Sequence, residues 1–515
     1  NINSDENKPD YISTVEVAGP GFINFFLSNE YLLSNLKTIL REKDDFGKYE
    51  IGKDRKVMIE YGQPNTHKAF HIGHVKSAIS GLAMINLFSN FGFDVIKANF
   101  YGDVGMQVAK CLWGVQKIGV PNGLDDKSPD EKISFIQEAY VKGAKAFADN
   151  KDAEKEIRSI NIKVYSKEDP DINKLYELTR KWSRQHLEEV FKILNVEYDR
   201  EYPESEIAEI GKQLVLDNVG TVFKEDQGAI IFEGEKYGLH NRVFISSEGN
   251  VTYEGKDMAL GNLKSQEYDL EQSYIFTGLE QNDYFDVVIK ALETLNPTLK
   301  GKSHHIGFGH LLMKGKKESS RSGISITGKE LIMQMIDLAN QAVSERQEFD
   351  EEQKDVVSKT VGLGALRYMI LKHPFHVSFS FDPDEALSLS GKSAPYVMYS
   401  YTRAMSIIRE WAGDPDDLLQ EEIDLDLRKD ELKIAKMLSK YENIVLDSLN
   451  NLSPHFIANY IYEVAQEFNK FYSENQVLNA EDEKVKNLRL LITFSTAQIL
   501  KNGLNLLGID VLERM

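Results

Sequence analysis

The most regular pattern of hydrophobic and polar positions in this chain begins at residue 57. An apolar run over 57–61 predicts a short strand, and apolar side chains at helical spacing over 75–92 predict a helix that stops at Gly92. A second apolar run over 94–101 predicts another strand. A strand, a glycine-bearing turn, a helix and a further strand, in this order, predict the opening of a parallel, doubly wound α/β sheet of the Rossmann-like class.

The turn between the first strand and the helix reads His71-Ile72-Gly73-His74. Glycine lets the backbone come close to a ligand, and two histidines three positions apart can contact phosphate or ribose oxygens. The helix that follows offers unpaired N–H groups and the positive end of its dipole to an anion. The plainer interpretation is that both histidines only cap the helix. The pattern favours a nucleotide site, with ATP as the ligand.

The remaining pattern divides the chain into parts. Before residue 51 it predicts a strand near 13–19 and a helix over about 29–42. From about 116 to 240 the chain is charged and mostly helical, like an insertion, and strand signals return at 243–246 and 273–278. After about 350 it reads as long amphipathic helices, which is typical of a helix bundle. We therefore expect three parts, with the bounds 1–50, 51–345 and 346–515.

Composition narrows the class of protein without identifying it. The 515 residues are enough for more than one domain, and a hydrophobic content of 42% supports sizeable cores. The single cysteine, Cys111, excludes a disulfide framework and indicates a reducing compartment. No apolar run reaches the length of about 18 residues that a membrane span requires. We expect neither a membrane span nor a signal peptide.

The charge does not favour a nucleic-acid partner at first sight. The formal net charge is −20, whereas basic faces dominate affinity for nucleic acids. Charge is uneven along the chain, however. Basic residues gather between Lys314 and Arg321, including Lys316 and Lys317, and acidic residues gather over 414–431. The acidic run is most simply a solvated linker or helix face, and it would suppress non-specific binding.

Several separated blocks of sequence point to one family. They include IEYGQPN (59–65), KAFHIGH (68–74) and NFYGDVGMQ (99–107), and further blocks at 252–260, 278–285, 307–331, 361–409 and the closing LERM. In this order and over nearly the whole chain, they resemble the arginyl-tRNA synthetase branch of the class I aminoacyl-tRNA synthetases. The HIGH sequence alone marks only a wider nucleotidyl-transfer superfamily.

The resemblance implies an arginine–tRNA ligase of the cytoplasm. It would activate arginine with ATP and Mg²⁺ as substrates, without a tightly bound metal, and transfer it to the 3′ end of tRNA(Arg). A Rossmann-like catalytic domain with a helical insertion would precede an all-α anticodon-binding bundle. Residues 1–50 resemble the tail of an N-terminal tRNA-contacting domain, most of which we expect to be absent because the chain lacks an initial methionine. The family also implies a monomer and activation that depends on tRNA.

For ATP, the resemblance assigns His71, Gly73 and His74, with both histidines catalytic. It also assigns a basic loop that matches a KMSKS-type sequence, namely Lys317, Ser319, Ser320 and Arg321. Ser320 stands where the second lysine of that pattern belongs, and Lys68 occupies the place from which a lysine is thought to compensate. Lys317 and Lys68 are therefore expected to be catalytic, with Lys314 and Lys316 as possible helpers. A solvated basic turn is the plainer interpretation of the loop. The pair Thr327 and Glu330 predicts a capping box, and thus a helix start, directly after it.

For arginine, the resemblance assigns Tyr253 and Asp257, whose spacing of four places them on one side of a helix. A carboxylate can pair with a guanidinium through two hydrogen bonds. Glu60 and Asn65 match positions for the α-amino end, and Gln107 and Gln281 match polar residues of the same pocket. The plainer interpretation of Asp257 is a helix-cap carboxylate.

For the tRNA anticodon, the resemblance assigns Tyr396, Tyr399, Arg403 and the terminal Met515. Aromatic rings stack on unpaired bases and arginines hold phosphates. An aromatic pair three positions apart is otherwise an ordinary core contact.

Two other classes of function stay open at this point. One is another enzyme of the HIGH superfamily, either a synthetase for a different amino acid or a small nucleotidylyltransferase. The chain length argues against the small enzymes, and Asp257 argues against a hydrophobic amino acid. The other is a non-catalytic tRNA-binding paralogue, which the departure at Ser320 and the acidic balance favour and the intact HIGH sequence disfavours.

Overall fold

The computed structural model describes residues 8–314, 326–344, 349–421, 423, 425–480 and 482–515. The chain forms two compact units. We call residues 51–334 and 375–381 the sheet unit, and residues 1–50, 335–374 and 382–515 the helical unit. The helix α10 (Gly328–Ser344) begins in the sheet unit and continues in the helical unit.

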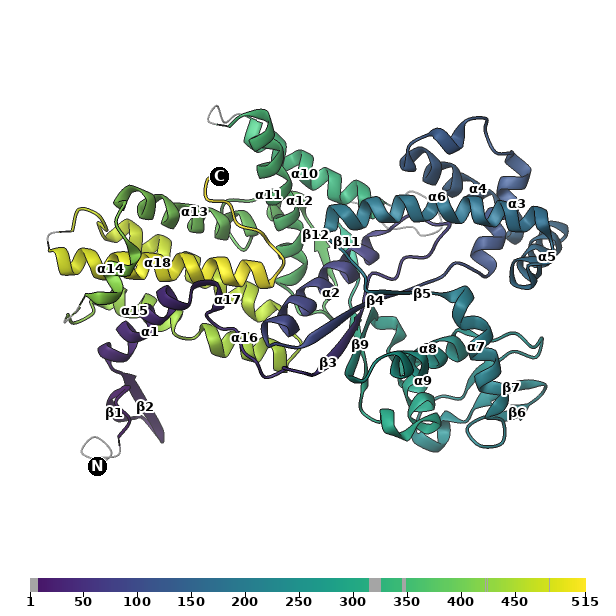
Figure 1. Ribbon diagram of the computed structural model, residues 1–515, viewed down its shortest axis with the longest axis horizontal. Coiled ribbons are helices and arrows are strands. Elements are labelled where there is room, and N and C mark those ends of the chain that lie inside the picture. The colour runs from purple at the N-terminus through teal and green to yellow at the C-terminus, as the bar shows by residue number, and fades with distance from the viewer. Residues whose placement is uncertain (1–7, 315–325, 345–348, 422, 424, 481) are drawn as a thin grey trace. The chain divides into compact units, whose positions relative to one another are not determined.

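The sheet unit is built on five parallel strands in the order β10-β9-β3-β4-β5. Four of them, β3, β4, β5 and β9, are labelled in Figure 1. The strands are β3 (Lys56–Glu60), β4 (Asp94–Tyr101), β5 (Arg200–Pro203), β9 (Leu270–Gly278) and β10 (Ser303–Phe308). From β3 the chain adds β4 and β5 on one side and later returns to add β9 and β10 on the other. The carboxyl ends of these parallel strands therefore lie at one edge of the sheet, and the chain changes its direction of crossover beside β3. Open α/β sheets bind ligands at such a point.

The predicted opening of this sheet is confirmed. β3 carries the consecutive buried residues Val57, Met58 and Ile59, as expected of a strand covered on both faces. The helix α2 spans Ile72–Asn90, and Gly92 follows it with a φ of 80°, a conformation that glycine adopts without strain. This strand–helix–strand unit places the HIGH turn at the carboxyl end of the central strand.

The segment between β4 and β9 is mostly helical, as expected, but it also contains strands. Its helices are α3 (Met106–Ile118), α4 (Pro129–Asp149), α5 (Lys151–Ser166), α6 (Pro170–Leu194), α7 (Glu204–Asp217) and α8 (Tyr253–Glu267). Besides β5, it forms an antiparallel sheet of β6 (Lys224–Asp226), β7 (Ala229–Phe232) and β8 (Arg242–Ile245). Of these strands, β8 confirms the strand predicted at 243–246. The sheet unit is completed by α9 (Asn282–Leu295) and by the parallel pair β11 (Leu311–Met313) and β12 (Phe379–Phe381).

The helical unit is a bundle in which α18 packs against α1, α13, α15 and α17. Its helices are α1 (Asn29–Glu42), α11 (Glu351–Leu371), α12 (Pro383–Ala386), α13 (Ala394–Trp411), α14 (Pro415–Gln420), α15 (Lys429–Leu438), α16 (Tyr441–Asn450), α17 (His455–Glu474) and α18 (Glu483–Leu506). An antiparallel hairpin of β1 (Ile12–Ala18) and β2 (Phe22–Leu27) precedes α1. None of the helices in the described part of the chain combines the length and hydropathy needed to cross a lipid bilayer.

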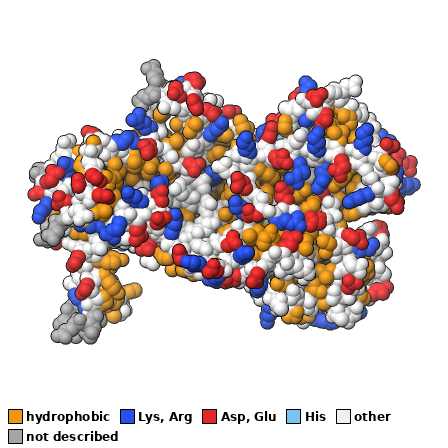
Figure 2. Space-filling model, viewed as in Figure 1, with side chains coloured by type: hydrophobic (Ala, Val, Ile, Leu, Met, Phe, Trp, Pro, Cys, Tyr) orange, Lys and Arg blue, Asp and Glu red, His pale blue; other side chains and the backbone are white. Residues whose placement is uncertain are grey.

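Acidic and basic side chains are interspersed over the face of the molecule shown in Figure 2. The net charge of −20 is therefore not gathered into one acidic surface on this face.

Candidate functional site

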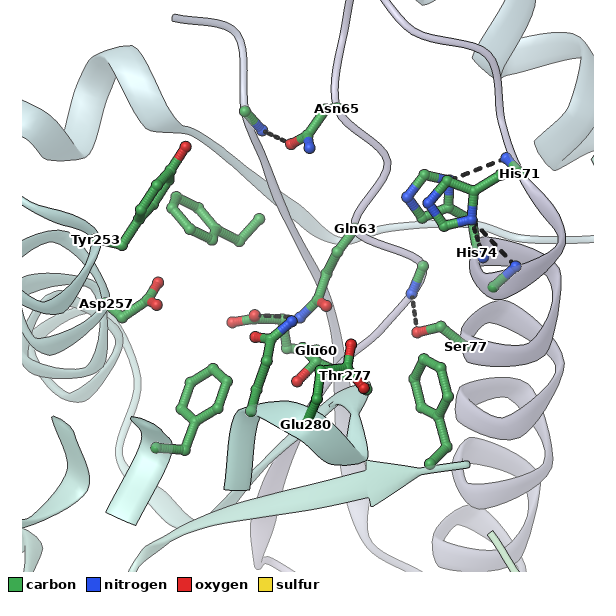
Figure 3. Close-up of a pocket in the computed structure, with 18 of the residues that line it drawn as sticks. Glu60, Gln63, Asn65, His71, His74, Ser77, Tyr253, Asp257, Thr277 and Glu280 are labelled. Atoms are coloured by element: carbon green, nitrogen blue, oxygen red, sulfur yellow. Dashed lines mark hydrogen bonds between the residues drawn. The ribbon is translucent and has the colours of Figure 1, made fainter. Parts of the chain in front are cut away.

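A pocket of about 400 Å³ lies at the carboxyl ends of the five parallel strands. The first half of its wall lies at the ends of β3 (Glu60, Gly62, Gln63, Asn65), β4 (Phe100, Gly102) and β5 (Glu204), and in the HIGH turn and α2 (His71, Gly73, His74, Ser77). The second half comes from α8 (Tyr253, Asp257), from the end of β9 and the start of α9 (Thr277, Gly278, Glu280, Gln281, Phe285), and from the end of β10 (Phe308, His310). Figure 3 shows Tyr253 and Asp257 on one side of this pocket and His71 and His74 on the opposite side.

The two histidines of the HIGH turn cap α2, as the plainer interpretation proposed. Nδ1 of His71 accepts the N–H groups of Gly73 at 3.1 Å and His74 at 3.4 Å, and Nδ1 of His74 accepts the N–H of His71 at 3.2 Å. The two rings stack with their centroids 3.5 Å apart. A neutral imidazole that accepts at Nδ1 carries its proton on Nε2. Capping therefore leaves both histidines as Nε2–H donors.

The surroundings keep both rings neutral. Desolvation, with a smaller contribution from the charge of Lys68, lowers the pKa of His71 to about 4. Desolvation also holds the pKa of His74 well below its usual value, helped by His71 and Lys68. Both histidines line the pocket. At neutral pH they are uncharged donors, which suits contacts to phosphate or ribose oxygens.

The opposite side of the pocket carries a carboxylate with an unusual proton affinity. Burial raises the pKa of Asp257 to about 7, whereas a hydrogen bond from the Tyr284 hydroxyl lowers it. Tyr253 begins α8 one turn before Asp257, and both line the pocket, as the spacing of four predicts. A cation bound here would restore the ionised form of Asp257.

Glu60, at the end of β3, is buried and pairs with Lys264 of α8. It also accepts a hydrogen bond from the Gln63 amide. Asn65 Oδ1 accepts the N–H of Gly102 at 3.0 Å. A Cβ at Gly102 would collide with Asn65, which makes a glycine necessary at this close approach. Glu60 and Asn65 therefore stand in the pocket in fixed orientations.

Two acidic residues that line the pocket, Glu204 and Glu280, were not predicted from the sequence. Glu204 starts α7 directly after β5, lines the pocket and pairs with the buried Lys256. Burial raises the pKa of Glu204, and Lys256 opposes that rise. Glu280 follows β9 and also lines the pocket. Both directly follow parallel strands, so the strand-end rule would have found them once β5 and the order of the sheet were known.

Two of the remaining predicted residues, Gln107 and Lys68, do not belong to the pocket wall. Gln107, near the start of α3, is not in the pocket wall, although its Nε2 would lie 2.9 Å from a Cβ on Gly102. Gln281 does line the pocket. The Nζ of Lys68 lies over the ring of Tyr140, 5.2 Å from its centroid, rather than in the pocket wall.

The loop predicted to contact phosphates falls mainly outside the described residues. These are Lys316, Lys317, Ser319, Ser320 and Arg321. Lys314 is described, and its backbone N–H bonds to the carbonyl of Phe381 at 3.1 Å. The predicted capping box is confirmed, because Thr327 N–H donates to Glu330 at 2.7 Å and Glu330 N–H donates to Thr327 Oγ1 at 3.2 Å. Thr327 also forms an antiparallel bridge with His71.

Comparisons with known proteins identify the family of the chain. Residues 35–382 match the family model for the catalytic domain of the class I (R) tRNA synthetases. Residues 397–515 match the DALR anticodon binding domain, and residues 2–27 match the arginyl tRNA synthetase N terminal domain. The chain belongs to the arginyl-tRNA synthetase family. The resemblance drawn from the sequence and the predicted fold class are both confirmed.

Relatives in this family match along almost the whole chain. The arginine–tRNA ligase of Clostridium perfringens is 30% identical over 506 residues, covering 97% of this chain and 88% of the relative. That of Clostridium botulinum is 30% identical over 514 residues, covering 99% and 89%. The solved arginyl-tRNA synthetase of Thermus thermophilus superposes with a TM-score of 0.80 at 25% identity, covering 98% of this chain and 89% of that one. The Plasmodium falciparum structure shares the fold, with a TM-score of 0.79 at 21% identity over 98% and 87%.

In the family's DALR region, the helical unit has a hollow of about 550 Å³. We call it the α13 hollow. Its wall consists of Phe349, Tyr399, Thr402, Arg403, Ser406, Ile407, Arg409, Glu410, Tyr472, Arg514 and Met515. Three of the four residues predicted to contact the anticodon therefore lie together. The fourth, Tyr396, lies outside this wall and packs on Tyr462, with ring centroids 5.4 Å apart.

The side chains of the α13 hollow are ordered by contacts with one another. Arg403 Nη1 donates to Asn469 at 2.7 Å and Nη2 to the Tyr399 hydroxyl at 3.2 Å. The guanidinium lies 4.8 Å from the centroid of the Tyr399 ring and 5.4 Å from that of Tyr472. Tyr472 and Arg514 were not predicted, because only the fold brings α17 and the C-terminal segment beside α13. Arg409, on α13 itself, was also not predicted.

Proposed function

We propose that this chain is an arginine–tRNA ligase in which the pocket of the sheet unit carries out both chemical steps. The carboxylate of arginine attacks the α-phosphorus of ATP, pyrophosphate leaves, and arginyl-adenylate forms. A ribose hydroxyl at the tRNA 3′ end then attacks the activated carbonyl, and AMP leaves. The observation that carries the proposal is a single pocket with a carboxylate on one wall and two neutral histidines on the opposite wall.

The histidine wall suits the nucleotide. His71 and His74 offer Nε2–H donors without a positive charge, beside the N-terminus of α2, which attracts anions. In-line transfer to phosphorus asks little covalent work of the protein, so positioning and charge stabilisation supply most of the catalysis. No cluster of three or more acidic, histidine or cysteine side chains suited to a metal occurs in the described ranges. In the proposal, Mg²⁺ enters as part of the ATP substrate, as the family resemblance implies.

The opposite wall suits a guanidinium. Asp257 and Glu204 provide two carboxylates, and Tyr253 provides a ring and a hydroxyl. A bound guanidinium would hold Asp257 ionised and form charge-assisted hydrogen bonds with it. We assign the α-amino group to Glu60 and Asn65 and supporting polar contacts to Gln281, with Gln107 behind Gly102. Lys68 and the loop residues Lys317, Ser319, Ser320 and Arg321 keep their sequence-based assignment to ATP.

The α13 hollow is the proposed site for the anticodon of tRNA(Arg). It combines two tyrosines with three arginines, the residue types that stack on unpaired bases and hold phosphates. Tyr396, which lies outside the wall of this hollow, keeps its sequence-based assignment to the anticodon. The proposal also keeps the monomeric state and the cytoplasmic location that the family resemblance implies.

Aminoacylation of total tRNA tests the proposal, with ATP, Mg²⁺ and each amino acid supplied in turn. We expect charging with arginine alone, and its loss in Asp257→Ala and His74→Ala. A loss of about hundredfold or more is typical when a transition-state donor is removed. Charging with another amino acid would overturn the assignment of Asp257. Binding of tRNA without any charging would favour the non-catalytic paralogue.

A further inference from the structure

Asp257, on the arginine side of the pocket, bonds to a side chain that does not itself line the cavity. Tyr284 lies in the first turn of α9, and its hydroxyl donates a hydrogen bond to Oδ2 of Asp257 in α8. Tyr284 is absent from the pocket wall, whereas Asp257 belongs to it. Within the described part of the chain, Oδ1 of Asp257 has no hydrogen-bond partner. The Tyr284 hydroxyl therefore occupies one oxygen of the Asp257 carboxylate, and the other oxygen remains for a ligand.

The position of Tyr284 is fixed from two further sides. The guanidinium of Arg242, in β8, lies over the Tyr284 ring at 5.3 Å from its centroid, and Arg242 pairs with Glu254 at 3.2 Å. The ring of Phe285 meets the Tyr284 ring edge-on, with centroids 5.0 Å apart. These contacts hold the phenol in place, so its hydroxyl points at Asp257 before any ligand arrives.

The groups around Asp257 shift its pKa in opposite directions, so the hydrogen bond from Tyr284 affects how much of Asp257 is ionised. Burial and the nearby carboxylates of Glu60 and Glu204 raise the pKa of Asp257, while Tyr284 and Lys264 lower it. The two lysines that share α8 with Asp257 are already paired with carboxylates of other elements, Lys264 with Glu60 of β3 and Lys256 with Glu204 of α7. Burial holds the pKa of Tyr284 well above its usual value, so the phenol keeps its proton and remains a donor.

We propose that Tyr284 is a positioning residue that makes the pocket selective for a positively charged guanidinium, by holding Asp257 as an oriented anion. The inference rests on the proposed function, because it assumes that Asp257 receives the side chain of arginine. A neutral analogue of similar shape, such as citrulline, gains less from an anionic Asp257, because it carries no charge to pair with the carboxylate. Without the phenol hydrogen bond, the carboxyl would be protonated more often and would turn more freely, and a cation would lose its advantage.

The test is Tyr284→Phe, measured by kcat/KM for arginine and for citrulline between pH 6 and pH 9. Because kcat/KM follows the ionised fraction of Asp257 in the free enzyme, in the wild type it should rise with pH through a midpoint near 7 and level off above about pH 8. In Tyr284→Phe the midpoint should move to higher pH. At pH 7, a midpoint that moves up by one unit lowers the ionised fraction of Asp257 from about one half to about one tenth, so the preference for arginine over citrulline should fall about fivefold. The KM for ATP should not change.

Tyr202→Phe is the matched control. It removes another phenol–carboxylate hydrogen bond of the sheet unit, from Tyr202 to Glu267 at 2.7 Å, away from the pocket wall. It should leave the pH midpoint and the amino-acid preference unchanged. If Tyr284→Phe lowers kcat/KM by the same factor at every pH, its role is merely structural and the proposal is overturned.

A calorimetric measurement on the wild type keeps the proposal testable if the variant folds poorly. With a pKa of about 7, half of the Asp257 carboxyls carry a proton at pH 7, and arginine binding should release about half a proton to the buffer. Release of nearly a full proton at pH 8 would show that Asp257 stays protonated in spite of Tyr284 and would overturn the proposal. A wild type that charges no arginine would instead defeat the proposed function, independently of Tyr284.

Discussion

At the scale of single residues, the two nitrogens of each HIGH histidine have different tasks. Nδ1 accepts backbone N–H groups and caps α2, whereas Nε2–H is left for the ligand. The sequence alone set capping and nucleotide binding against each other as alternatives. The structure removes that opposition, since capping is what fixes the tautomer that binding requires.

His71→Asn separates the two tasks. Asparagine is a good helix cap, so the variant should keep the stability of α2, whereas His71→Ala should cost about 1 kcal/mol. Both variants lack the Nε2–H donor and should lose about hundredfold in ATP–pyrophosphate exchange. Thermal melting and exchange kinetics on the same samples check this expectation. Full activity in His71→Asn would show that His71 acts only as a cap.

The pocket also shows which residues a sequence can and cannot disclose. Glu60, Asn65, His71, His74, Tyr253 and Asp257 sit in local patterns that mark them, and all six line the pocket. Glu204 and Tyr284 have no such local signal. Glu204 matters because β5 pairs with β4, and Tyr284 because α9 packs on α8, which are contacts that chain order does not reveal.

At the scale of elements, the first turn of α10 joins three parts of the sheet unit. Gly328 N–H donates to the carbonyl of Phe70 at 2.6 Å, next to the HIGH turn. Lys329 donates to Asp130 of α4 at 2.6 Å and to Glu189 of α6 at 2.8 Å. A lysine in the first turn of a helix opposes the helix dipole. The two carboxylates compensate for that cost and tie the start of α10 to the inserted helices.

Lys329→Met should therefore loosen the start of α10. Its side chain is 16% exposed, and we expect a cost of about 1 kcal/mol, because two charge-assisted hydrogen bonds are lost from half-exposed carboxylates. Hydrogen exchange at residues 327–331 should become faster. The control Lys359→Met breaks an exposed pair with Asp355 within α11 and should cost less than about 0.5 kcal/mol. Unchanged exchange at 327–331 would contradict a role for Lys329 in holding α10.

Elements were predicted well where one period persisted and poorly where strands were short. The predicted helix over 29–42 coincides with α1, and the strand over 94–101 coincides with β4. The strands β5, β6 and β7 have four residues or fewer and lie inside a stretch dominated by helices. A strand of that length has no measurable alternation, and its partners, rather than its own sequence, decide its conformation.

At the scale of the whole molecule, a net charge of −20 must be reconciled with an anionic partner. The α13 hollow provides positive charge locally, because Arg403, Arg409 and Arg514 lie there beside two tyrosines. Affinity for tRNA should therefore depend on a few cations and on stacking rather than on an extended basic surface.

Arg409→Gln should weaken tRNA binding several-fold near 0.1 M salt. It should also reduce the slope of log affinity against log salt by about one. Filter binding at a series of salt concentrations measures both quantities. Lys440→Gln removes an exposed cation outside the α13 hollow and serves as the control. An equal change in the two variants would show that only the net charge matters, not the hollow.

The strand order of the sheet has a consequence for synthesis on the ribosome. β3 is the central strand, yet its partner β9 begins at residue 270, more than two hundred residues after β3 ends. At about 5–20 residues per second, the nascent chain carries one open edge of β3 for roughly 10–40 seconds. During that time, the hydrophobic run over 57–59 is a target for chaperones and for pairing with neighbouring nascent chains. Translation speed between β4 and β9 should therefore influence the yield of folded protein.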